Sequence, residues 1–287
     1  NIFYSRRIGG EPTLEPSLDI DEEIVESPSI TNLLNATKIS GRTSKGLGIG
    51  FLNAVTENTY ATIKNTTTNQ NRKELIEPFR NGEGRDANVS GLVFDLNTKA
   101  NTYKLSGDTK FSYVNNIDNI KRGTNSSLYI GDTKGKYQYG FGSGYISKDY
   151  DHNDLGIIFT NNYYSFNSNA SYRTLKKTTN FNSIRLQTDI QTEFENSTNK
   201  LQLGTIAFAG DFFTLKNDGI NITTTISPFE TFDFYFPGVD GRYNYNPKYI
   251  DFSSIISTNR NRKYSFDLTQ NFIKHDQPGR KSYTISF

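Results

Sequence analysis

The stretch Asn182–Phe194, NSIRLQTDIQTEF, alternates between apolar and polar residues at nearly every step. One side of an extended chain would carry Ile184, Leu186, Ile190 and Phe194, and the other Arg185, Gln187, Asp189, Gln191 and Glu193. Successive side chains of a strand point to opposite faces of the sheet, so this spacing predicts a strand and not a helix. A strand of this length with one apolar and one charged face is typical of a transmembrane β-sheet that separates lipid from water.

The same alternation returns in Tyr103–Tyr113. Tyr103, Leu105, Phe111 and Tyr113 share one face, opposite Lys104, Ser106, Asp108, Lys110 and Ser112. At about 3.3 Å per residue and a tilt near 45°, the ten residues from Tyr103 to Tyr113 rise by roughly 23 Å. That height predicts an apolar band with an aromatic residue at each border.

The amino-acid composition agrees with a β-sheet that is apolar on one face only. The hydrophobic fraction is 34% and the mean hydropathy is -0.64, yet the chain has 21 Phe and 18 Tyr, which disordered chains lack. No run of about 18 apolar residues occurs, so the sequence predicts no transmembrane helix.

Several classes of function are disfavoured. The absence of Cys removes disulfides, thiolate catalysis and Cys-ligated zinc. A net charge of +2, from 32 basic and 30 acidic residues, gives no case for nucleic acid as a partner. No phosphate-binding glycine motif occurs, and we expect neither a cofactor nor a metal site. Because Met and a signal peptide are both absent, we expect a processed or partial product.

The chain divides into two parts. Residues 1–30 are aromatic and then acidic, and we expect a tether or plug segment. Residues 31–287 read as roughly fifteen strands of an antiparallel transmembrane β-barrel, with longer loops at residues 114–125 and 238–247. Residues 72–85 break the alternation, which indicates either a long loop or sequence missing near residues 79–84.

Three segments carry a family resemblance: FYSRRIG at residues 3–9, NATKISGRT running into KGLGIGFLNAVTE at residues 35–57, and NDLG at residues 153–156. Together they resemble large Bacteroidetes-type envelope proteins, in which a carbohydrate-binding family 9-like module precedes a C-terminal β-barrel domain of unknown function. The resemblance implies an outer-membrane barrel, a sugar-binding-like module upstream and further strands beyond Phe287. It carries no catalytic residues.

Two sets of residues are candidates for the site. The lumen-facing candidates are Lys104, Asp108, Lys110, Arg185, Asp189 and Glu193, and the lipid-facing girdle candidates are Tyr103, Tyr113, Tyr137 and Tyr145. The charged set could line a pore or grip a plug. Alternatively it forms a ladder of ion pairs, since opposite charges on one sheet face stabilise each other modestly.

The two histidines, His152 and His275, each stand beside an acid, as in a hydrolase at the rim of a barrel. Both also lie in segments rich in Asp, Asn, Gly and Pro, which turns prefer. We therefore expect no catalytic residue and keep a rim hydrolase as an alternative.

The sequence favours a non-enzymatic barrel in the outer membrane of a Gram-negative bacterium, acting as a scaffold or accessory subunit. Its expected partners are the lipid bilayer, proteins of an envelope complex and a surface glycan bound through the upstream module. A channel or transporter with a charged lumen is the second alternative.

Overall fold

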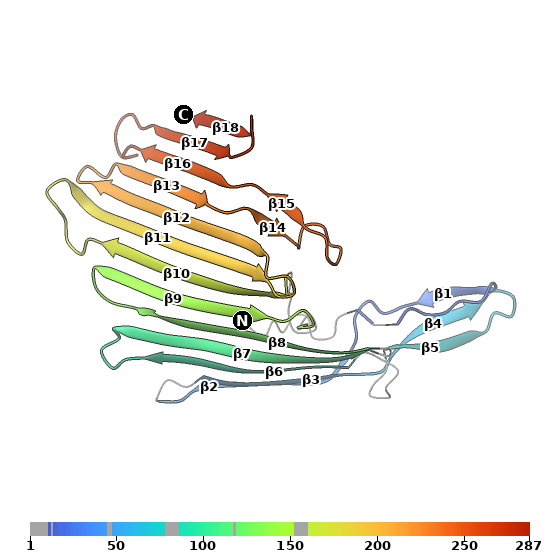
Figure 1. Ribbon diagram of the computed structural model, residues 1–287. Coiled ribbons are helices and arrows are strands. Elements are labelled where there is room, and N and C mark those ends of the chain that lie inside the picture. The colour runs from blue at the N-terminus through green and yellow to red at the C-terminus, as the bar shows by residue number, and fades with distance from the viewer. Residues whose placement is uncertain (1–10, 13, 45–47, 78–85, 117–118, 152–159) are drawn as a thin grey trace. The chain divides into compact units, whose positions relative to one another are not determined.

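The chain folds into antiparallel sheets. A computed structural model describes residues 11–12, 14–44, 48–77, 86–116, 119–151 and 160–287 (Figure 1). Every regular element in these ranges is a strand, and every pair whose register is known is antiparallel. The prediction of an all-β antiparallel fold is confirmed. The described ranges hold eighteen strands rather than about fifteen, because short strands carry too little alternation to be recognised.

Eleven strands form one long sheet with the order β18-β17-β16-β13-β12-β11-β10-β9-β8-β7-β6. They are β6 (Asp86–Asn97), β7 (Tyr103–Asn116), β8 (Asn119–Asp132), β9 (Tyr137–Ile146), β10 (Tyr163–Arg173), β11 (Phe181–Glu195), β12 (Leu201–Thr214), β13 (Gly219–Ser227), β16 (Tyr249–Ser257), β17 (Asp267–His275) and β18 (Lys281–Ser286). This is a meander with one inserted hairpin, β14 (Thr231–Asp233) and β15 (Asn244–Asn246). In the described order β6 and β18 are the two edges.

Two smaller sheets come from the first part of the chain. One pairs β2 (Leu33–Arg42) with β3 (Gly48–Thr56). The other has the order β1-β4-β5 and contains β1 (Glu22–Glu26), β4 (Thr59–Asn65) and β5 (Asn71–Glu77). Ala61, Ile63 and Ile76 are its buried apolar side chains.

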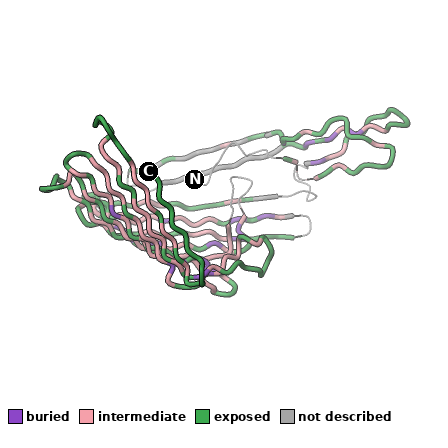
Figure 2. Tube along the Cα trace, turned by 90° about the horizontal axis from the view of Figure 1, so that it is seen from above, coloured by how far each residue is buried: buried purple, intermediate pink, exposed green. Residues whose placement is uncertain are grey.

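Contacts divide the chain into two compact units. The first comprises residues 1–94, 108–125 and 147–161, and the second residues 95–107, 126–146 and 162–287. Within the second unit, most residues of strands β9–β13 are exposed or partly exposed, and few are buried (Figure 2). Most residues along these strands are therefore only partly covered within the described part of the chain.

Three segments differ from the expectation. Residues 22–26, inside the predicted tether, are β1, because pairing with β4 satisfies their backbone. Residues 114–125 do not form a long loop, since β7 extends to Asn116 and β8 begins at Asn119. Residues 71–77, where the alternation fails, are β5, which pairs with β4 through a bulge. The boundary predicted at residue 30 stays a prediction.

Candidate functional site

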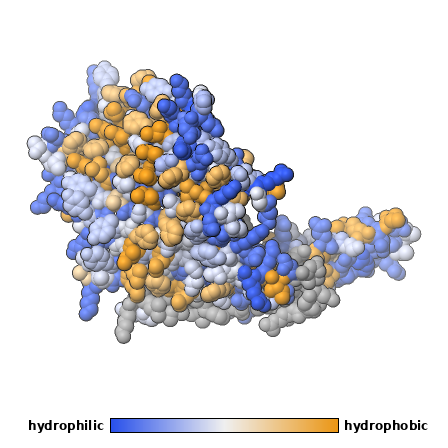
Figure 3. Space-filling view, viewed as in Figure 1, coloured by the Kyte–Doolittle hydropathy of each residue, from blue (hydrophilic) through white to orange (hydrophobic). Residues whose placement is uncertain are grey.

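The long sheet has two chemically different faces. In β11 the register places Leu186 opposite Tyr172 and Gly210, and Ile190 opposite Ser168 and Ile206. This side, here called the apolar face, also carries Tyr139, Phe141 and Phe208, whose exposed fractions are 59%, 52% and 46%. Figure 3 shows apolar side chains gathered over the long sheet. Many large apolar residues on this face are therefore exposed to the surroundings.

The other side, here called the polar face, is closely packed. Gln187 lies opposite Ser171 and Ala209, and Asp189 lies opposite Asn169 and Ala207. Glycines on this face leave room for neighbouring side chains: a Cβ at Gly131 would be 2.6 Å from the Tyr129 hydroxyl, and one at Gly142 would be 2.5 Å from Asn167 Oδ1. Small residues thus let long polar side chains lie flat across the sheet.

Most of the predicted lumen-facing charges have partners nearby. Lys104 Nζ is 3.3 Å from Asp95 Oδ2, and Lys110 Nζ is 2.6 Å from Asp108 Oδ2 on the same strand. The Lys110 and Asp108 side chains are only 18% and 19% exposed. Both lysines of the charged set are thus ion-paired with an aspartate.

Arg185 and Asp189 are joined through the residue between them. Arg185 Nη2 donates to Gln187 Oε1 at 2.8 Å, and Gln187 Nε2 donates to Asp189 Oδ2 at 2.7 Å. These three side chains share one face of β11, as their spacing of two requires. The spacing of residues placed Gln187 on this face, but only Arg185 and Asp189 were among the lumen-facing candidates.

The lumen-facing candidate Glu193 is hydrogen-bonded to a tyrosine. The Tyr235 hydroxyl donates to Glu193 Oε1 at 2.9 Å and accepts a hydrogen bond from Gln202 Nε2 at 3.0 Å. Gln202 is buried, and its Oε1 accepts the Phe234 N–H at 3.3 Å. Burial and the Glu193 carboxylate raise the pKa of Tyr235, which keeps the hydroxyl protonated as a donor.

This contact fastens the hairpin β14–β15 onto β11 and β12. Lys200, just before β12, adds a second attachment: its Nζ is 4.8 Å from the ring centre of Phe232 and 4.0 Å from that of Tyr243. The sequence offered no sign of either attachment, because the partners are more than thirty residues apart.

A cavity of about 390 Å³ lies beside the hairpin. Its lining includes Glu193, Thr205, Tyr235, Tyr249, His275 and Arg280. Acidic, basic and aromatic side chains thus surround one space at the end of β11, β13 and β17. A cavity of this size and mixed polarity can hold water or a small polar molecule.

His275 lines this cavity, and no carboxylate among the described residues is hydrogen-bonded to its ring. Its Nδ1 is buried and has no hydrogen-bond partner in the described residues, and its ring packs against Tyr249 with centroids 5.7 Å apart. His152, the other candidate of a rim hydrolase, lies outside the described residues. Within the described ranges no three His, Cys, Asp or Glu side chains gather as metal ligands would.

The girdle candidates all lie at exposed positions. The exposed fractions of Tyr103, Tyr113, Tyr137 and Tyr145 are 52%, 38%, 68% and 43%. Tyr137 packs against Tyr172 of the next strand, with ring centroids 5.1 Å apart. Their proposed contact with lipid stays a prediction.

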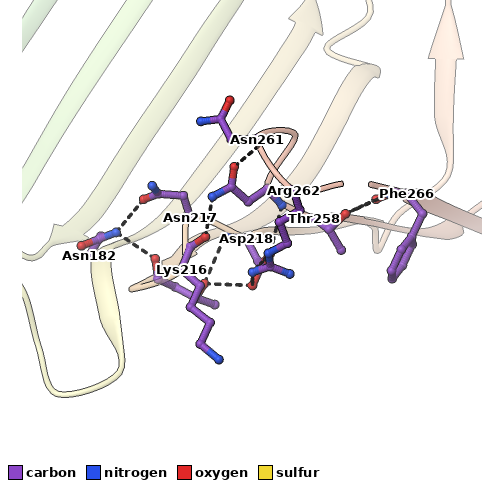
Figure 4. A network of polar contacts seen from close by, with 10 residues as sticks. Asn182, Lys216, Asn217, Asp218, Thr258, Asn261, Arg262 and Phe266 are labelled. Atoms are coloured by element: carbon purple, nitrogen blue, oxygen red, sulfur yellow. Dashed lines mark hydrogen bonds and ion pairs between the residues drawn. The ribbon is translucent and has the colours of Figure 1, made fainter. Parts of the chain in front are cut away.

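A polar network ties two connections of the long sheet together (Figure 4). Asp218, between β12 and β13, accepts the Asn259 N–H at 3.0 Å and a hydrogen bond from Arg262 Nη2 at 2.8 Å. These contacts lower the pKa of Asp218. Asn182 joins the network by donating to Asn217 Oδ1 at 2.8 Å. These hydrogen bonds join the β12–β13 connection to the β16–β17 connection and to the start of β11.

Comparison with known proteins places the chain in a family. Residues 1–81 and 79–287 match the model of a family described as a domain of unknown function, DUF5916. The chain belongs to this family. The comparisons found no match among curated proteins and none among solved structures. No helix in the described part of this DUF5916 member is long and apolar enough to cross a membrane.

Proposed function

We propose that this DUF5916 chain forms the wall of a transmembrane β-barrel in the outer membrane of a Gram-negative bacterium, and that it works without catalysis as a scaffold or accessory subunit of an envelope assembly. The observation that carries this proposal is the pair of faces on the long sheet. Large apolar side chains are exposed on one face, while amides and charges are packed on the other.

A soluble protein would leave this apolar face in water. Monomeric soluble proteins rarely expose an apolar patch of more than a few hundred Å², whereas here such side chains cover strand after strand. β11 has fifteen residues and β7, β8 and β12 have fourteen each. At a tilt near 45° such strands rise by about 33 Å, enough for an apolar band of roughly 25 Å.

The paired charges favour a scaffold over the channel. Lys110 with Asp108, and Arg185 through Gln187 with Asp189, already satisfy one another on the polar face. The Bacteroidetes source, the upstream sugar-binding-like module and the glycan partner rest on the resemblance alone. They belong to the proposal as the context in which the scaffold would work.

Because the chain has no Cys, a single substitution introduces the sole thiol, which makes a labelling test clean. Phe208→Cys and Ala209→Cys are adjacent on β12 and point to opposite faces. In native membranes, Phe208→Cys should resist a water-soluble maleimide until the protein is denatured, and Ala209→Cys should react at least tenfold faster. The reverse order, or equal rates, would contradict the proposal. Heat-modifiable migration on a gel gives an independent check of a detergent-stable barrel.

A further inference from the structure

An exposed acidic and aliphatic surface lies at Leu18–Glu26, here called the N-terminal ridge. Its exposed aliphatic residues are Leu18, Ile20, Ile24 and Val25, and its exposed carboxylates are Asp19, Asp21, Glu23 and Glu26. Ile20 is fully exposed, with a relative accessibility of 105%. In Figure 3 the sheet of β1, β4 and β5 shows hydrophobic residues among hydrophilic ones.

The ridge is held in place by Arg72 of β5. Arg72 Nε and Nη2 donate to the two oxygens of Glu22 at 2.8 and 2.7 Å, and Nη2 also donates to the Ser17 carbonyl at 2.7 Å. Arg72 Nη1 donates to Glu74 Oε2 at 2.6 Å, and the Ser17 N–H donates to Glu74 Oε1 at 3.0 Å. Hydrogen bonds from Arg72 lower the pKa of Glu22 to about 2, so this clamp stays ionised at physiological pH.

A segment whose backbone is held in place and whose aliphatic side chains are exposed is preorganised for binding. The conformational entropy that a partner would have to remove is already lost, since Arg72 and the pairing of β1 with β4 fix the backbone. Exposed aliphatic groups on such a surface gain free energy when a partner covers them. The simpler alternative, a solvated edge, predicts that nothing covers the ridge.

The charge of the N-terminal ridge determines which kind of partner can bind to it. Residues 11–30 contain seven carboxylates and no Lys or Arg. An anionic lipid surface or a nucleic acid would be repelled, since both attract basic segments. A second copy of the ridge would be repelled in the same way. A surface of apolar side chains surrounded by Lys and Arg would be attracted and would bury Ile20, Ile24 and Val25.

We propose that the N-terminal ridge docks a protein partner through a basic, apolar-centred surface. This inference rests on the proposed scaffold function and names the chemistry of the partner. Its test uses the full chain in its native envelope, with a photo-crosslinking amino acid in place of Ile20. We expect a protein adduct whose crosslinked peptide contains Lys or Arg next to apolar residues.

Glu26→Lys and Glu57→Lys are matched charge reversals on and off the ridge, since both carboxylates are exposed. Glu26→Lys should lower the yield of the adduct by about three- to tenfold, as expected for reversing an exposed ion pair. Glu57→Lys should lower it by less than half. Raising the salt concentration should also lower the yield.

Adducts to lipid, adducts to a second copy, no adduct, or equal yields from the two charge reversals would each overturn the docking proposal. Flotation of the same membranes separates the two hypotheses. Protein that floats with lipid but gives no adduct refutes the docking surface alone. Protein that fails to float refutes the barrel, whatever the adduct shows.

Discussion

Replacing Ile190 by Arg tests whether the apolar face contacts lipid. Ile190 is two residues from the middle of the fifteen-residue strand β11 and is 41% exposed. In the proposed barrel, with the middle of β11 at the centre of the membrane, about 3.3 Å per residue and a tilt near 45° would place Ile190 roughly 5 Å from that centre. An Arg facing lipid costs about 2–4 kcal/mol at the midplane and about 0–1 kcal/mol at the interfaces. At this depth we expect Ile190→Arg to lower the free energy of unfolding by about 2 kcal/mol, or roughly thirtyfold in the folding equilibrium.

Gln191→Arg is the matched control, because Gln191 is the next residue and points to the polar face. We expect it to change the free energy of unfolding by less than about 0.5 kcal/mol, as for an ordinary surface substitution. The assay is guanidinium unfolding in lipid vesicles, followed by far-UV circular dichroism because the chain has no Trp. A loss below about 0.5 kcal/mol for Ile190→Arg, or a similar loss for both variants, would refute lipid contact on this face.

Three further substitutions test the packing and the polar contacts, each by denaturant unfolding. Gly123→Ala should lower the free energy of unfolding by about 1–3 kcal/mol, because the new Cβ would overlap the Tyr150 backbone, whereas Gly41→Ala has nothing within 4 Å and should be neutral. Tyr235→Phe should cost about 1–3 kcal/mol, since it removes a hydroxyl bonded to Glu193 and buried Gln202; a loss under 0.5 kcal/mol would contradict this. Asp218→Asn should make the free energy of unfolding depend less on pH in the acidic range. The pKa of Asp218 is lowered from 3.8, so its stabilisation is present above that pH and is lost as the pH falls through the folded-state pKa. Equal slopes for Asp218→Asn and the wild type between pH 5 and 3 would show that the network contributes nothing.

The alternating strands were predictable because the signal is local. Whether residue i faces the same way as residue i+2 depends only on the extended backbone, so Asn182–Phe194 and Tyr103–Tyr113 were recognised as two-faced strands. Strand β15 and strand β1 were missed for the opposite reason. Each is short and becomes a strand only through a partner elsewhere in the chain.

The residues of the candidate site could be predicted from the sequence more easily than the contacts between them. Lys104, Asp108, Lys110, Arg185, Asp189 and Glu193 were named from the polar face of their strands, and most of them meet a polar partner there. Their partners were not all foreseen. The contact between Glu193 and Tyr235 could not be predicted from the spacing of residues, because it depends on how the β14–β15 hairpin folds back.

The sequence by itself determined the fold class, the two faces of the long strands and the exclusion of thiol chemistry. These follow from neighbouring residues and from composition, which need no knowledge of distant contacts. Only the tertiary structure decided that the hairpin β14–β15 covers part of the polar face, that Gly123 lies against the Tyr150 backbone, and that Arg72 clamps the acidic segment. Each of these depends on residues far apart in the chain, and their distances are set by the pairing of strands.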